Sequence, residues 1–129
     1  MSNPISPELQ TGTVGELLVQ IRLLQYGVQA APPLKDSGND LVALKGEVIR
    51  TIQVKTTSTD NLPPWPNPLR IYRLVAIVRL SGEGNDLRLD ATDIFLISKA
   101  SLSTLERTWE AVEQNRMSQQ NIDNLFHDP

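Results

Sequence analysis

The sequence has no cysteine among its 129 residues. This absence excludes disulfide bonds, thiolate nucleophiles and cysteine-ligated zinc sites together. Histidine is scarce as well, because the single one, His127, lies two residues from the end and is a poor candidate for a general base. With no cysteine to indicate an oxidising compartment, a cytoplasmic location is the default expectation.

Long apolar runs are also missing. No segment approaches the roughly 20 consecutive apolar residues that a membrane-spanning helix needs. The first ten residues, MSNPISPELQ, contain neither the basic region nor the apolar core of a signal peptide. We therefore expect no membrane span and no signal peptide.

The chain has no excess of positive charge, since its formal net charge is −3. This charge counts against extended, sequence-independent binding to nucleic acid, which depends on contacts of Lys and Arg with phosphates. It leaves a local basic patch open, because the local charge matters more than the total. The basic residues are spread along the sequence, and no cluster stands out.

What is present is typical of one folded domain over residues 1–129. The apolar fraction is 40% and the charged fraction is 21%, as in globular proteins with a single core. A helix is predicted over about residues 8–26, where apolar residues recur at intervals of three and four positions. The expected buried stripe of this helix consists of Val14, Leu17, Leu18, Ile21 and Leu24.

The rest of the chain predicts a mixed sheet. The expected strands are residues 28–34, 40–44, 47–57, 71–80 and 93–98. Four prolines between residues 60 and 70 exclude a helix or a central strand, so this segment is predicted to be a loop. A surface helix is expected over 101–114, and the polar tail from about residue 117 is expected to fray. The predicted order is αβββ-loop-ββα, an α/β fold whose central sheet is flanked by helices.

Three polar residues fall at one end of the hairpin predicted for the second and third strands. Side chains alternate along a strand, so Gln53 and Lys55 lie on one face of it. A turn at Lys45-Gly46 pairs Asp40 with Thr51 and makes Asp40 the diagonal neighbour of Gln53, roughly 7–8 Å away. The hairpin alone is therefore expected to gather these three side chains.

These side chains suit the metal-assisted hydrolysis of a phosphodiester. Glu16 joins them if the first helix covers the same face of the sheet. Two carboxylates, Glu16 and Asp40, can bind a hard divalent cation such as Mg²⁺, and Gln53 can add a neutral carbonyl ligand or hold a water. Lys55 can orient the attacking water, lower its pKa or neutralise charge that develops on the phosphate.

The same residues form a recognisable pattern: Gly15-Glu16 on a first helix, Gly38-Asn39-Asp40 opening a strand, and Gln53-Val54-Lys55 on the next strand. This pattern resembles the PD-(D/E)XK nuclease superfamily, and within it the small Holliday-junction-resolvase-like members and the intron-encoded endonucleases with a QxK variant. The resemblance covers roughly residues 11–57.

The resemblance implies a restriction-endonuclease-like fold and a Mg²⁺ or Mn²⁺ cofactor. It implies Asp40 as the central metal ligand, Glu16 as an auxiliary ligand and Lys55 as the catalytic lysine. Gln53 would take the place of the usual acidic ligand, and the backbone carbonyl of Val54 would complete the metal site. Because Gln53 removes one negative charge, weaker metal binding is expected unless Glu16 compensates.

Each of these residues also has a purely structural interpretation. A lysine such as Lys55 discourages aggregation on an edge strand, and Asp40 is a residue type favoured in turns. Glu16 places a favourable negative charge near a helix N-terminus. These alternatives remain open at the level of the sequence.

Three further residues are candidates for contact with nucleic acid. Trp65 in the proline-rich segment could stack on a base, and Arg70 and Arg73 could touch phosphates. The alternatives are a tryptophan that folds back onto the core and arginines that are only solvated.

The function expected from the whole pattern is that of a Mg²⁺-dependent endonuclease that hydrolyses phosphodiester bonds in double-stranded or branched DNA. A homodimer or a partner protein is plausible, since a small nuclease must engage two strands. One alternative is a catalytically inactive DNA-binding or regulatory module that keeps the nuclease fold. Another is a subunit that needs a partner to supply DNA contacts.

Overall fold

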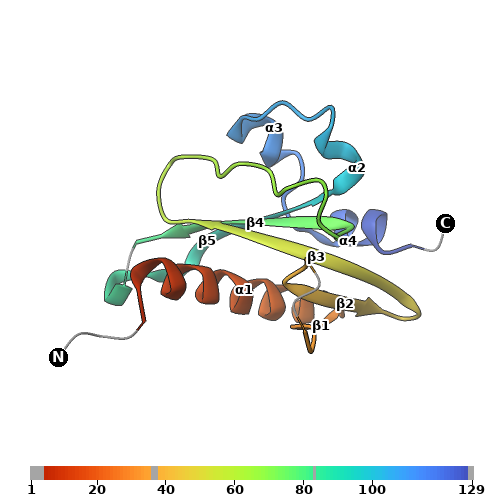
Figure 1. Ribbon diagram of the computed structural model, residues 1–129, viewed down its shortest axis with the longest axis horizontal. Helices are drawn as coiled ribbons and strands as arrows, with labels where there is room; N and C mark the ends of the chain where they lie inside the picture. The colour runs from red at the N-terminus through yellow and green to blue at the C-terminus, as the bar shows by residue number, and fades with distance from the viewer. Residues whose placement is uncertain (1–4, 36–37, 83, 128–129) are drawn as a thin grey trace.

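The computed structural model describes residues 5–35, 38–82 and 84–127. They form a single sheet with helices on both of its faces (Figure 1). Across the sheet, the strands lie in chain order: β1 (Gln29–Ala31), β2 (Leu41–Lys45), β3 (Val48–Thr57), β4 (Leu74–Ser81) and β5 (Arg88–Ser98). Strands β3 and β4 run parallel, whereas all other neighbours are antiparallel. The predicted mixed α/β fold is confirmed.

The two faces of the sheet are distinguished by alternation along β4. Leu74, Ala76 and Val78 point to one face, which carries helix α1 (Pro7–Gln25) and helix α4 (Gln119–Leu125), and which we call the α1 face. Val75 and Ile77 point to the other, which we call the loop face. The loop face is covered by residues 58–73 and by the short helices α2 (Lys99–Leu102) and α3 (Trp109–Glu113). Strand β4 is therefore buried on both sides, which explains its continuous apolar sequence.

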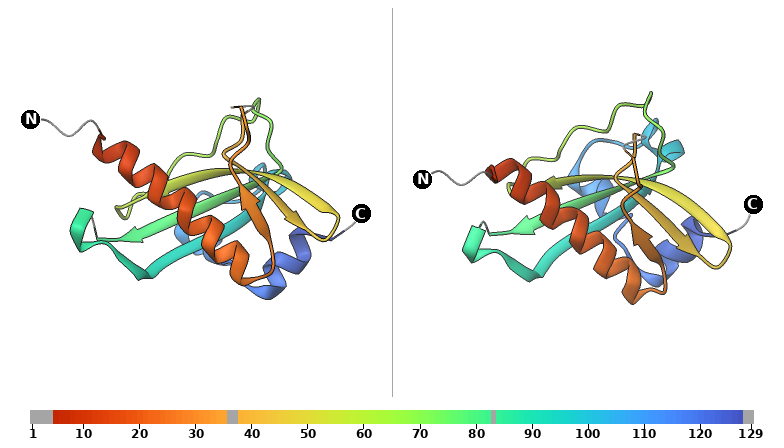
Figure 2. Two further views of the ribbon diagram at one scale, coloured as in Figure 1. Left: turned by 90° about the horizontal axis from the view of Figure 1, so that it is seen from below. Right: turned by 60° about the horizontal axis from the view of Figure 1, so that its bottom comes forward.

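Helix α1 crosses its face of the sheet diagonally (Figure 2). The predicted buried stripe is wrong for three residues, since Leu17, Ile21 and Leu24 are 52%, 56% and 64% exposed. The residues that are buried are Gly15, Val19 and Leu23, spaced four apart. Apolar side chains occupy two adjoining stripes of this helix. The small Gly15 lets the stripe that contains Val19 and Leu23 approach the sheet more closely.

The C-terminal third differs from the predictions in two respects. The single helix expected over 101–114 is broken into α2 and α3, because the Thr108 side chain accepts a hydrogen bond from the amide of Ala111 and starts a new helix. The expected fraying is not seen over residues 117–127, where α4 forms. Ile122 on this helix and Phe126 directly after it are almost fully buried against the α1 face.

The loop predicted between residues 60 and 70 is confirmed, and side chains from the C-terminal third hold it. Trp109 donates from Nε1 to the carbonyl of Asp60 at 2.6 Å, and Arg107 donates to the carbonyl of Leu62 at 2.8 Å. Strand boundaries also shift: β4 begins at Leu74 rather than 71, β5 begins at Arg88 rather than 93, and β1 has only three residues. Across the described parts of the chain, every helix is too short or too polar to traverse a lipid bilayer.

Candidate functional site

The β2–β3 hairpin turns at Gly46-Glu47, so that Lys45 pairs with Val48. The predicted turn at Lys45-Gly46 is therefore wrong. Gly46 has a φ of +61°, and it occupies the first central position, where a type II′ hairpin turn needs glycine. The pairing shifts by two residues, and Val42, not Asp40, lies opposite Thr51. Because side chains repeat every two residues, this shift keeps each of them on its predicted face.

Asp40 immediately precedes β2, and its hydrogen bonds connect the start of that strand to β3. Its backbone amide donates to the carbonyl of Ile52 at 2.9 Å. Its carboxylate oxygen Oδ2 accepts two hydrogen bonds, from the side-chain Nε2 of Gln53 at 2.9 Å and from the backbone amide of Val54 at 2.8 Å. The amide and carbonyl of a strand residue lie on the same side of the strand, so the carbonyl of Val54 also lies on the side of Asp40.

Gln53 leaves a polar atom without a partner. The residue is 7% exposed, and while Nε2 donates to Asp40, the buried oxygen Oε1 accepts no hydrogen bond from any described residue. A buried acceptor without a donor costs about 1–3 kcal/mol, and such atoms are rare in folded proteins. The oxygen is thus an acceptor to which the described part of the chain supplies no donor.

Glu16 reaches this cluster from α1. The condition set for Glu16 is not met, because α1 packs on the face opposite Gln53, against Val54 and its neighbours. The Glu16 carboxyl nevertheless lies near that of Asp40, close enough for the two groups to interact. The pKa of Glu16 is raised above its ordinary value of 4.5, first because burial desolvates the carboxyl and then because of the negative charge of Asp40. Two carboxyl groups therefore lie close together at this point of the structure.

A close approach of α1 to β3 positions Glu16. A Cβ atom added to Gly15 would overlap the hydroxyl and methyl groups of Thr56. Only glycine at this position allows the helix to pass so close to the strand. The sequence pattern singled out Gly15-Glu16 but gave no sign that Thr56 is the residue opposite.

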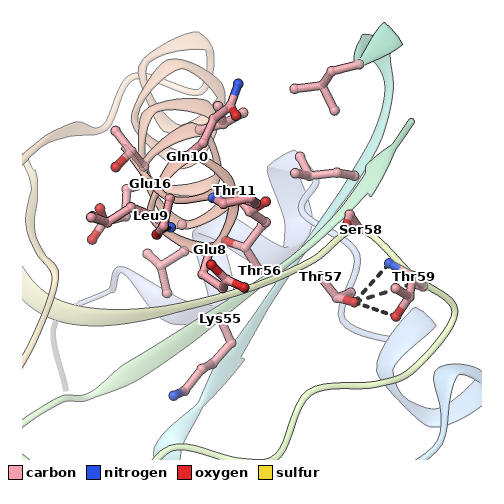
Figure 3. Close-up of a pocket in the computed structure, with 18 of the residues that line it drawn as sticks. Glu8, Leu9, Gln10, Thr11, Glu16, Lys55, Thr56, Thr57, Ser58 and Thr59 are labelled. Atoms are coloured by element: carbon pink, nitrogen blue, oxygen red, sulfur yellow. Dashed lines mark hydrogen bonds between the residues drawn. The ribbon is translucent and has the colours of Figure 1, made fainter. Parts of the chain in front are cut away.

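Lys55 points away from this carboxyl pair. Figure 3 shows Glu16 and Thr56 on the helix side of β3 and Lys55 on the other side. Lys55 shares the loop face with Gln53, two residues and about 6–7 Å further along the strand. Within the described residues, its ammonium group forms no hydrogen bond or ion pair. The structure thus brings Glu16, Asp40 and Gln53 together. Lys55 lies nearby on the loop face of β3, on the opposite side of the strand from Glu16.

A groove of about 1130 Å³ leads to the site from the N-terminal half of α1 (Figure 3). Glu16, Asp40, Gln53 and Lys55 all line it. Most of its other polar lining consists of hydroxyl groups, on Ser6, Thr11, Thr13, Thr56, Thr57, Ser58 and Thr59. The site is therefore open to a large molecule.

The three residues proposed for nucleic-acid contact have different environments. Trp65 is partly buried and packs on the loop-face core, so it is folded back as the alternative interpretation expected. Arg70 and Arg73 are exposed, and their side chains form no hydrogen bond or ion pair in the described part of the chain. Gly38 links them to the site: its φ is +96°, and a Cβ there would lie 3.0 Å from the backbone nitrogen of Ile71.

The donor set fits a hard divalent cation. Among the described residues, no three His, Cys, Asp or Glu side chains gather, so a cation would rest on two carboxylates and neutral oxygens. Glu16 and Asp40 provide the carboxylates, and the bare Gln53 Oε1 and the Val54 carbonyl are the neutral candidates. Oxygen ligands of this kind are those that Mg²⁺ and Mn²⁺ bind.

Neither a protein-family model nor a curated protein matches this sequence. The structure is similar to that of a bacterial homing endonuclease, I-Ssp6803I. The TM-score is 0.55 and the sequence identity 16%, over 78% of this chain and 71% of that chain. At this identity the similarity shows a shared fold, and the expectation of a nuclease-like fold is confirmed to that extent.

Proposed function

We propose that the protein is a divalent-cation-dependent DNA endonuclease of the PD-(D/E)XK type. The observation that carries this proposal is the proximity of the Glu16 and Asp40 carboxyls, next to a Gln53 side chain that donates to Asp40 and whose buried oxygen receives no donor from the described residues. The likeness of the fold to that of a homing endonuclease supports it.

In this proposal, Glu16 and Asp40 hold Mg²⁺ or Mn²⁺ together with the Gln53 side-chain oxygen and the Val54 backbone carbonyl. When bound, such a cation polarises a phosphoryl oxygen and makes water more acidic. Asp40 is held for this role by two hydrogen bonds to one of its oxygens, one of them from the backbone of β3. The carboxylate therefore keeps its orientation without relying on a flexible partner.

Lys55 acts from the other side of β3. Its ammonium group is not engaged by any described residue, so it is available to a phosphate or a water. There it can orient the attacking water and neutralise negative charge that develops on the phosphate. A phosphate bound at the start of β2, next to Asp40, would then lie between the Glu16 and Asp40 carboxyls and the positive charge of Lys55.

The proposal is tested with purified protein on linear duplex, branched and single-stranded DNA, in the presence of Mg²⁺ or Mn²⁺. We expect cleavage of at least one substrate, and a loss of roughly 100-fold or more in Asp40→Asn and Lys55→Ala, since each removes a directly acting group. Lys45→Ala is the matched control, because Lys45 lies on the same hairpin but pairs with Asp123. Cleavage that persists in both site variants would reject the assignment.

A second candidate is a DNA-binding module with the nuclease fold and no hydrolytic activity. Gln53 favours this candidate, because its neutral side chain donates a hydrogen bond to Asp40. A carboxylate at the same position would bind a cation more strongly than this amide. Metal-independent DNA binding without cleavage of any substrate would support this candidate over the enzyme.

A duplex offers two strands to cut, so we propose that two copies, or one copy and a partner protein, act together. Sedimentation of the protein with and without duplex DNA measures this association directly. A complex with one protein chain per duplex that still cuts both strands would contradict it.

A further inference from the structure

Four cations lie around the site on the loop face: Lys55, Arg70, Arg73 and Lys99. Lys55 lies two residues beyond Gln53 on β3. Arg73 is placed on the other side of Gln53, because its amide donates to both the carbonyl and the hydroxyl of Thr51, two residues before Gln53. The strand rise puts Lys55 and Thr51 about 6–7 Å to either side of Gln53. We call these four residues the basic surface.

Backbone contacts hold the basic surface together. The Lys99 ammonium donates to the carbonyl of Arg70 at 2.8 Å and lies 4.3 Å from the centre of the Tyr72 ring. The Lys99 amide donates to the carbonyl of Arg73, also at 2.8 Å. Arg70 in turn lies against Gly38, two residues before Asp40. The cations after the long loop are thus fixed relative to the candidate metal ligands.

The side chains of the basic surface have no ion-pair partner as far as the structure describes the chain. In the described ranges, no carboxylate lies at ion-pair distance from any of the four. Elsewhere, Lys45, Arg79, Arg88 and Arg116 each pair with a carboxylate, whereas Arg22, Lys35, Arg50 and Arg107 have no ion pair among the described residues. The basic surface therefore holds half of the cations left unpaired in the described structure, in a chain whose net charge is −3.

The groove beside α1, which also reaches Gln53 and Lys55, has mainly acidic and hydroxyl-bearing polar lining. It is lined by the carboxyls of Glu8, Glu16 and Asp40 and by hydroxyl groups, and among its described lining residues Lys55 is the single cation. A polyanion laid along this groove would meet negative charge, whereas the basic surface would attract it.

We propose that the DNA backbone binds across the basic surface on the loop face, and not along the larger groove beneath α1. This inference rests on the proposed function for the identity of the polyanion. The phosphate at the site would lie beside Gln53, with neighbouring phosphates of the same strand reaching Lys55 on one side and Arg73 and Arg70 on the other. The groove would then be open to water and to departing product.

The test measures DNA binding by fluorescence anisotropy in EDTA, where no metal-dependent cleavage can interfere, over a series of salt concentrations. We expect Arg70→Gln and Arg73→Gln each to weaken binding several-fold for every DNA sequence. Each should also reduce the salt slope by about 0.9, the value for one phosphate contact. Arg88→Gln, which removes an exposed arginine already paired with Asp90, should leave binding unchanged.

The groove is tested in the same assay by Thr13→Glu, which adds a negative charge to its exposed lining. We expect no effect on binding. Weaker binding in Thr13→Glu, with unchanged binding in Arg70→Gln and Arg73→Gln, would overturn the inference. Thermal melting of each variant confirms that folding is intact.

Cleavage with Mg²⁺, measured separately, distinguishes the two proposals. Cleavage that is normal in the arginine variants, with unchanged binding, rejects the basic surface and leaves the endonuclease proposal standing. Binding that depends on both arginines, without cleavage of any DNA, upholds the basic surface and rejects the enzyme. Absence of any DNA binding rejects both.

Discussion

At the scale of single residues, the candidate site depends on how Asp40 is held. Alternation along the strand was sufficient to predict that Gln53 and Lys55 share a face, because that rule is independent of tertiary contacts. The contact between Asp40 and Gln53 was closer than predicted, because glycine moved the turn to residues 46 and 47. The missing hydrogen bond at Gln53 Oε1 could not be predicted, since it depends on every neighbouring atom.

Placing an acid at position 53 tests the proposed metal site. In Gln53→Glu the hydrogen bond from Nε2 to Asp40 is lost and a third carboxylate is placed beside two others. We expect the metal-free protein to lose about 1–3 kcal/mol of unfolding free energy and to regain stability with Mg²⁺ or Mn²⁺. Urea unfolding with EDTA and with each cation measures both effects. A variant that no cation stabilises would argue against a metal at this position.

The raised pKa of Glu16 predicts a pH dependence of stability in the metal-free protein. The folded state binds the Glu16 proton more tightly than the unfolded chain, because of burial and then of Asp40. The resulting stabilisation is complete below about pH 4.5 and is lost as the pH rises through the raised value. Because Glu16 is partly exposed, the effect should stay below about 1 kcal/mol.

Urea midpoints measured across this pH range in EDTA should therefore decline more steeply for the native protein than for Glu16→Gln. Glu8→Gln, on the same helix, is the control and should follow the native curve. Identical curves for the native protein and Glu16→Gln would show that the two carboxyls do not interact.

At the scale of elements, the decisive contact is that of α1 with β3. Apolar periodicity predicted the helix and its length closely, since that signal is local. It placed Val14 and Leu18 against the core correctly, but it wrongly included Leu17, Ile21 and Leu24, because these are as apolar as the residues that are buried. The choice between stripes is made by Gly15, whose lack of a side chain matters only when Thr56 lies opposite.

Gly15→Ala and Gly12→Ala form a matched pair on this helix. Alanine is the better helix former by about 0.5–1 kcal/mol, and a Cβ on Gly12 meets nothing within 4 Å, so Gly12→Ala should stabilise the protein. Gly15→Ala should instead destabilise it by about 1–3 kcal/mol through overpacking against Thr56. It should also weaken the stabilisation by Mg²⁺, because Glu16 moves away from Asp40. Equal stabilisation by both substitutions would refute the close approach.

At the scale of the whole molecule, the C-terminal segment completes the core beneath the sheet. Arg50 on β3 donates to the carbonyls of Leu125 and His127 at the end of α4. Asn121 on α4 donates to the carbonyl of Leu96 on β5. The sequence predicted a fraying tail because polar residues outnumber apolar ones there. The tail is nevertheless ordered, because a few apolar side chains are enough to dock a helix on a sheet face that is otherwise uncovered.

Ile122→Ala should therefore destabilise the protein by about 2–5 kcal/mol, as for other fully buried isoleucines. Gln120→Ala, at an exposed position of the same helix, should change stability by no more than about 0.5 kcal/mol. Urea unfolding compares the two variants. Equal stability would mean that α4 does not contribute to the folded core.

The parallel pairing of β3 and β4 also bears on the order in which the chain folds. Parallel strands are usually joined by a helix, but residues 58–73 form none. The two hairpins, β2–β3 and β4–β5, join strands that are neighbours in the sequence, whereas the parallel pair must first close this loop. Pairings between distant segments form slowly, so we expect the hairpins to form early and β3 to join β4 late. Asp40 and Gln53 would then meet in a folding nucleus of their own, before Arg73 and Lys99 are brought beside them.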